Sequence, residues 1–86
     1  MLTLFFAGNQ RLDEVPAGSP LTDNRQYSEY FARLLARQKG EPHCHIHEIR
    51  VDYSGVEYTG REPLGDATTY RLKQASQVAS VTSIEC

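Results

Sequence analysis

The feature that most constrains this chain is a single stripe of large apolar side chains that repeats with the period of an α-helix. The stripe occupies positions i, i+3, i+4, i+7 and i+8: Tyr27, Tyr30, Phe31, Leu34 and Leu35. Residues at this spacing lie on one face of a helix. The pattern predicts an amphipathic helix at about residues 23 to 39 that buries Tyr27, Phe31, Leu34 and Leu35. On this interpretation, Leu34→Ala should cost roughly 2–5 kcal/mol.

Both ends of this helix carry sequence signals. Thr22 or Asp23 can serve as the N-cap, and Asp23 and Gln26 have the spacing of a capping box. Gly40 suits the left-handed position that ends a helix, and Pro42 prevents its continuation. The helix is therefore expected to end before residue 40.

Strand signals lie on both sides of the helix. Residues 2 to 7 form an apolar run before the turn signal Gly8-Asn9, which predicts a buried strand. A short strand at residues 11 to 15 could form a hairpin with it. Residues 43 to 53 alternate strictly, which predicts a half-buried strand. Its inward face would carry His43, His45, His47, Ile49, Val51 and Tyr53.

Ser54-Gly55 can turn this strand into a second one at residues 56 to 60. A two-residue turn would pair Tyr53 with Val56 and would set Asp52 opposite Glu57, a like-charge pair. Residues 61 to 66 are expected to form a loop. The remainder predicts two strands with a turn near residues 75 to 77.

The order is then β-α-β-β-β-β. It predicts an α+β fold with one amphipathic helix packed on a small, mostly antiparallel sheet. A chain of 86 residues is long enough for one domain, so residues 1–86 are expected to form a single small α+β domain.

Composition excludes some classes of function and favours a cytoplasmic location. The chain has 9 Lys+Arg against 11 Asp+Glu, without the basic excess of a general nucleic-acid binder. No apolar run approaches a membrane span, and residues 1 to 7 lack the basic start of a secretory signal. The two cysteines, Cys44 and Cys86, are expected to be reduced rather than to form a disulfide.

All three histidines of the chain lie within five residues, which makes them candidate metal ligands. On a strand, His43, His45 and His47 point the same way, with neighbouring pairs roughly 7 Å apart. His45 and His47 are the better pair for a zinc ion, but a third ligand cannot be named. We therefore expect no cofactor, with zinc as the alternative. The preferred interpretation is that the histidines cover the rim of the sheet.

Two arginines of the helix, Arg33 and Arg37, lie one turn apart and could contact phosphate or the carboxylates of a partner. Glu29 stands four residues before Arg33, which is the favourable order for an ion pair on a solvated helix face. Nucleic-acid binding is therefore kept as an alternative that we do not prefer.

Five tyrosines exceed what a thin core needs. Tyrosine is a frequent anchor of protein interfaces, and Tyr53 and Tyr58 stand beside predicted turns. No complete catalytic motif accompanies them. The sequence therefore favours a small non-enzymatic regulatory or accessory protein. It would bind a protein partner through Tyr53, Tyr58, Arg33 and Arg37. A metal-binding protein or small metalloenzyme that uses residues 43 to 47 is the alternative.

The last predicted strand carries little charge before Glu85, although it includes Val81 and Ile84. An uncharged strand at the edge of a sheet can pair with a second copy. We therefore expect a homodimer through this strand.

Overall fold

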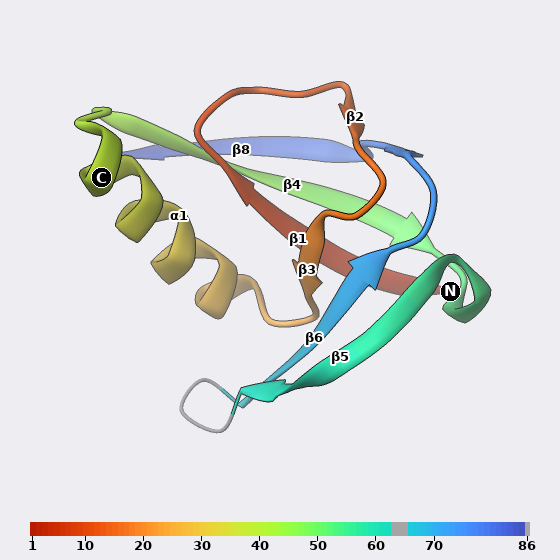
Figure 1. The fold of residues 1–86 in the computed structure, drawn as a ribbon. Helices are drawn as coiled ribbons and strands as arrows, with labels where there is room; N and C mark the ends of the chain where they lie inside the picture. The colour runs from red at the N-terminus through yellow and green to blue at the C-terminus, as the bar shows by residue number, and fades with distance from the viewer. Residues whose placement is uncertain (63–65, 86) are drawn as a thin grey trace.

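The computed structural model describes residues 1–62 and 66–85, which form one helix and a twisted sheet (Figure 1). The elements in chain order are β1 (Leu2–Gly8), β2 (Glu14–Val15), β3 (Pro20–Thr22), α1 (Arg25–Lys39), β4 (His43–Val51), the 3-10 turn η1 (Tyr53–Gly55), β5 (Val56–Glu62), β6 (Ala67–Leu72), β7 (Ser76–Gln77) and β8 (Ser80–Glu85). In the described part of the chain, no helix has the length and apolar character needed to cross a membrane.

The main sheet has the strand order β5-β6-β3-β1-β4-β8, and every pair in it is antiparallel. β2 and β7 form a second, two-stranded sheet. The predicted α+β class, with one helix packed on a mostly antiparallel sheet, is confirmed. The strand predicted at residues 2 to 7 is β1. The turn expected near residues 75 to 77 is wrong, because Ser76–Gln77 form β7 and pair with β2, and the chain bends at residues 73–74 and 79 instead.

The predicted hairpin between β4 and β5 is wrong. η1 redirects the chain after β4, and β5 pairs with β6 instead. In this register Glu57 lies opposite Arg71, and Tyr58 lies opposite Tyr70. The observed pairing therefore replaces a like-charge pair, Asp52 with Glu57, by an opposite-charge pair and an aromatic pair.

Two further predictions concern short segments of the chain. The expected hairpin of residues 11 to 15 with β1 is absent, because β2 pairs with β7. The predicted loop at residues 61 to 66 falls largely on residues 63–65, outside the described part, and β5 extends through Glu62. The thiol of Cys44 is buried and donates to the carbonyl of Ile84, 3.8 Å away, whereas Cys86 lies outside the described residues.

β4 is buried on both faces rather than on one. Its Ile49 joins Leu4, Leu21, Val56 and other residues in a first core. Cys44 and Ile46, on its opposite face, pack against Ala32 and Ala36 of α1 in a second core. The predicted alternation of side chains along β4 is confirmed, but α1 covers the face of the strand that was predicted to be exposed.

The N-cap of the helix lies one residue after Asp23, the later of the two predicted caps. Asn24 is the N-cap, and its side chain accepts a hydrogen bond from the backbone N–H of Tyr27. Thr22 and Asp23 make different hydrogen bonds. The Thr22 hydroxyl accepts one from the N–H of Asn24, and the Asp23 carboxylate accepts one from the N–H of Thr68 on β6. The capping box is therefore absent, and the helix start is tied to the sheet instead. Gly40 ends the helix with φ of 70°, as predicted.

The predicted buried face of α1 is wrong. The buried row consists of small residues, Ser28, Ala32 and Ala36, at i, i+4 and i+8. Phe31 and Leu34 are each 39% exposed. Small side chains let a helix lie close to its neighbour, because the distance between packed elements depends on the residues at the contact. The row of small residues packs on β1 and β4, and the large apolar residues are displaced from the core.

Candidate functional site

The three histidines of β4 have different surroundings. His43 is exposed, and His45 is half-buried, with its Nδ1 2.8 Å from the hydroxyl of Ser83. His47 is fully buried, and its ring lies 5.6 Å from the ring of Phe6, tilted by 49°. They share a strand face, as predicted, but they do not share an environment.

His47 uses both of its ring nitrogens within the protein. Its Nε2 accepts a hydrogen bond from the backbone N–H of Leu12 at 2.9 Å, and its Nδ1 lies 3.2 Å from the carbonyl of Phe6. Because Nε2 accepts, Nδ1 carries the proton and donates to Phe6, so the imidazole is neutral. Burial lowers the pKa of His47; the Phe6 carbonyl opposes this shift, and the nearby charges of His45 and Arg11 reinforce it. His47 thus attaches the segment before β2 to the sheet.

This arrangement bears directly on the zinc hypothesis. In the described part of the chain, no group of three or more His, Cys, Asp or Glu side chains is placed to hold a metal ion. A zinc ion on His47 would have to displace the hydrogen bond from Leu12, since a metal needs the same lone pair. Zinc binding by His43, His45 and His47 stays a prediction that titration can test.

The residues predicted to bind a partner lie in two separate places. Tyr53 and Tyr58 are 70% and 64% exposed beside β5, and the ring of Tyr58 packs edge-on against Tyr70 at 6.2 Å. Burial, and the neighbouring ionisable groups Tyr53, Asp23 and Tyr58, raise the pKa of Tyr70. Arg33 and Arg37 belong to the C-terminal half of α1, and β5 lies away from that half of the helix in Figure 1. The structure therefore does not unite these four residues in one surface.

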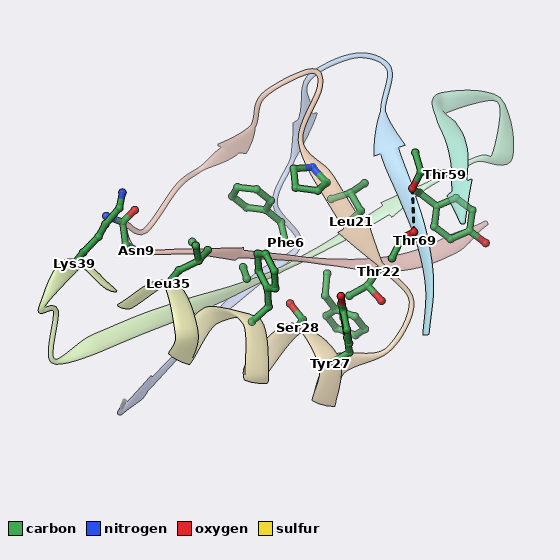
Figure 2. Close-up of a pocket in the computed structure, with 16 residues that line it drawn as sticks. Phe6, Asn9, Leu21, Thr22, Tyr27, Ser28, Leu35, Lys39, Thr59 and Thr69 are labelled. Carbon is green, nitrogen blue, oxygen red and sulfur yellow. Dashed lines mark hydrogen bonds between the residues drawn. The ribbon is translucent and has the colours of Figure 1, made fainter. Parts of the chain in front are cut away.

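A groove with a volume of about 340 Å³ lies between α1 and the sheet. One wall is a helical row at i, i+4, i+8 and i+12: Tyr27, Phe31, Leu35 and Lys39, called here the groove row. The opposite wall comes from β1, β3, β5 and β6 and includes Phe5, Phe6, Ala7, Leu21, Thr59, Thr69 and Tyr70. In Figure 2, Phe6, Leu21 and Thr69 of this wall lie across the opening from the helix.

The groove exists because α1 covers only part of the sheet. The helix packs on β1 and β4 through its small residues, while β3, β6 and β5 extend the sheet beyond it. The groove row faces this extension without filling the space. Within that row, the rings of Tyr27 and Phe31 stack at 6.4 Å with an angle of 21° between their planes. The predicted apolar stripe therefore lines a cavity.

Polar groups occupy three positions along this apolar groove. Lys39 and Asn9 lie at one end and Thr59 and Thr69 at the other, where their hydroxyls are hydrogen-bonded at 3.0 Å (Figure 2). Ser28 lies between them, only 2% exposed, and its hydroxyl has no hydrogen-bond partner in the described structure. A buried hydroxyl left without a partner is costly and uncommon in proteins.

Sequence reasoning missed the groove and found its residues for another reason. Tyr27, Phe31 and Leu35 were recognised as an apolar stripe, but no sequence signal distinguishes a stripe that faces a core from one that faces a cavity. Ser28, Ala32 and Ala36 form a second row of small residues beside the stripe, and this row shows only that the helix has two faces able to pack on a sheet.

A second surface of α1 lies outside the groove. Tyr30 and Leu34, called here the outer row, are one turn apart and are 64% and 39% exposed. The helix around them carries four cations, Arg25, Arg33, Arg37 and Lys39, and the single anion Glu29. Because the whole chain has a net charge of -2, α1 is a basic element on an otherwise acidic domain.

An apolar groove and an exposed aromatic helix face are both typical of binding sites. The buried histidine, which is the natural candidate for a catalytic base, lies in hydrogen bonds to the backbone. Comparison of this chain with protein-family models, curated proteins and solved structures finds no match, so its function has to be argued from the groove and the helix face themselves.

Proposed function

We propose that this chain is a small non-enzymatic accessory or regulatory protein that binds another protein through the outer row of α1. One observation carries the proposal. Tyr30 and Leu34 project from a well-formed helix, yet they are 64% and 39% exposed and contribute little to the core. Phe31, at the rim of the groove, extends the same surface.

These side chains have the character of interface anchors. Large aromatic residues supply much of the binding energy at protein interfaces, and a contiguous apolar patch on a small domain is typical of an interaction site. Each of them sits on a rigid helix, so little conformational entropy would be lost on binding. A partner that covers the outer row would remove apolar surface from water.

The charge of α1 suggests what the partner looks like. Arg33 is half-buried and Arg37 is exposed on the helix that carries the outer row. A partner segment with apolar anchors and flanking Asp or Glu residues would complement both features, and opposite charges would speed association and select against basic partners. The proposed partner is therefore an acidic amphipathic segment of another protein.

A selection of peptides tests this proposal. The immobilised chain is used to select from a phage-displayed random peptide library, and the affinities of the selected peptides are measured by fluorescence polarisation. We expect apolar anchors flanked by acidic residues, and at least about tenfold weaker binding to Tyr30→Ser/Leu34→Ser, because the loss of two anchors exceeds about 1.4 kcal/mol.

The matched control is Tyr53→Ser/Tyr58→Ser, which removes two aromatic rings of similar exposure from the other side of the molecule. This control should bind the selected peptides like the unchanged chain. The reverse result, loss of binding in the control alone, would move the interface to Tyr53 and Tyr58. Failure to select any peptide that depends on the outer row would refute the proposal.

The basic character of α1 also keeps nucleic-acid association as a second candidate. Its four cations would contact phosphates, and such binding weakens steeply with salt. Retention of the chain on immobilised duplex DNA or RNA, lost in Arg33→Gln/Arg37→Gln and weakened by added salt, would favour this candidate. Absence of retention at low salt would remove it.

A further inference from the structure

We propose that the groove is a binding site for a small amphipathic carboxylate, an extended apolar acid with a hydroxyl at its far end. Its carboxylate would be held at Lys39, its chain would lie along the groove row, and its hydroxyl would meet Ser28. Tyr30 and Leu34 do not line the groove, so this proposal is tested separately from the protein partner, although Phe31 borders both surfaces.

The size and walls of the groove suit such a ligand. Small-molecule sites commonly have volumes of about 300–1,000 Å³ and apolar walls with a few polar groups. The groove, at about 340 Å³, lies at the lower end of this range. Phe6, Leu21, Phe31 and Leu35 supply apolar surface on both walls. An apolar chain would replace water along this surface, which is favourable in proportion to the area covered.

Lys39 selects the charge of the ligand. Its side chain lines the groove, and in the described residues it has no ion pair. Asn9, which lines the same end, adds an amide group (Figure 2). The partial negative charge at the end of the helix opposes an anion, but the N–H groups of Gly40 and Glu41 bond to the carbonyls of Ala36 and Arg37, and the Lys39 ammonium supplies a full positive charge. A carboxylate at this end would therefore meet a cation.

Ser28 selects the second polar group. Its hydroxyl is buried on the groove side of α1 and lacks a partner, whereas its backbone N–H bonds to Asn24 at 3.1 Å. This hydroxyl is covered, so a ligand reaches it only after a side chain that lines the groove shifts. Phe31 is 39% exposed at the rim, and exposed side chains change rotamer rapidly. A ligand hydroxyl beside Ser28 would form the hydrogen bond that the Ser28 hydroxyl lacks.

The distance between the two polar ends determines the length of the ligand. Ser28 and Lys39 are separated along the helix by roughly 16 Å, from a rise of 1.5 Å per residue. A medium-length acyl chain can span this distance when extended. Suitable probes are ω-hydroxydodecanoate, which has both polar ends, dodecanoate, which lacks the hydroxyl, and dodecanol, which lacks the carboxylate.

Isothermal titration of the full chain with these probes tests the proposal. We expect ω-hydroxydodecanoate to bind about threefold to tenfold more tightly than dodecanoate, as one added hydrogen bond implies. Ser28→Ala should abolish this preference and leave dodecanoate binding unchanged. Lys39→Gln should weaken both acids by about threefold and remove the salt dependence of binding.

Arg37→Gln is the matched control, since it removes a cation of the same helix turn that does not line the groove. It should bind both acids like the unchanged chain, as should Tyr30→Ser/Leu34→Ser, so that failure here and failure of the partner proposal remain separate. Circular dichroism of each variant checks its fold. Three results would overturn the proposal: no probe binds, Lys39→Gln binds unchanged, or the preference for the hydroxyl survives in Ser28→Ala.

Discussion

The buried histidine of β4 makes the stability of this protein depend on pH in a predictable direction. His47 is fully buried, and its Nε2 accepts the hydrogen bond from Leu12 that an imidazolium could not accept. Burial is the main cause that lowers its pKa below the ordinary value of 6.5. The unfolded chain therefore binds a proton at this residue more readily than the folded chain does.

The sign of the effect follows from that difference. Above about pH 6.5 both states carry a neutral His47, and its contribution to stability is fully present. As the pH falls below this value, the unfolded state takes up the proton first, and stability is lost until the lowered pKa of the folded state is passed. The slope in this window can reach about 1.4 kcal/mol per pH unit for one residue.

Urea denaturation between about pH 7.5 and about pH 5.5 measures this slope. The unchanged chain is compared with His47→Phe, which removes the titrating group and leaves the Leu12 N–H without an acceptor. This loss should lower the free energy of unfolding by about 1–3 kcal/mol near pH 7. We expect the difference in stability between the two chains to shrink as the pH falls. His43→Asn, which alters an exposed histidine of the same strand, is the control and should keep the dependence. A constant difference between the unchanged chain and His47→Phe across the window would refute this account of His47.

Three further predictions concern the helix and the edge of the sheet. Leu34→Ala should lower the free energy of unfolding by only about 1 kcal/mol in urea denaturation, because Leu34 is already 39% exposed. Ala36→Leu, which overpacks the contact with the sheet, should lower it by about 1–3 kcal/mol. A larger loss in Leu34→Ala than in Ala36→Leu would show that the large apolar residues form the buried face. Gly40→Ala should cost about 1–2 kcal/mol, since its φ is 70° while the space around its Cβ is open, and an unchanged midpoint would contradict this backbone argument. β8 is an edge of the main sheet, so sedimentation at micromolar concentration should detect a dimer that Ser83→Lys dissociates; a monomeric unchanged chain would exclude pairing through this edge.

Local signals in the sequence were reliable where a short segment decides its own conformation. The helix period of residues 25 to 39 and the end of the helix at Gly40 depend on neighbouring residues and on the freedom of glycine to adopt positive φ. The strand at residues 2 to 8 and the alternation of residues 43 to 51 are likewise local, because β-branched and aromatic runs favour extended backbone.

Pairing between strands was not determined in the same way. Residues 56 to 60 could extend from a tight turn onto β4 or, as observed, pair with β6. Both arrangements keep the alternation of apolar and polar residues. What separates them is the register that sets Glu57 opposite Arg71 and Tyr58 opposite Tyr70, and those partners lie more than ten residues further along the chain. A long-range contact of this kind leaves no mark in either segment alone.

The sequence by itself determined the α+β class, the span of the helix and the presence of one large apolar stripe upon it. Only the tertiary structure decided which row of the helix is buried, because a helix with small residues beside large ones can pack on a sheet through either row. Once Ser28, Ala32 and Ala36 pack on β1 and β4, the groove row faces a part of the sheet that it does not reach. The groove, the unpaired hydroxyl of Ser28 and the exposed outer row all follow from this packing of α1 on the sheet. The packing depends on the shapes of the helix and sheet surfaces rather than on the hydrophobicity of either one.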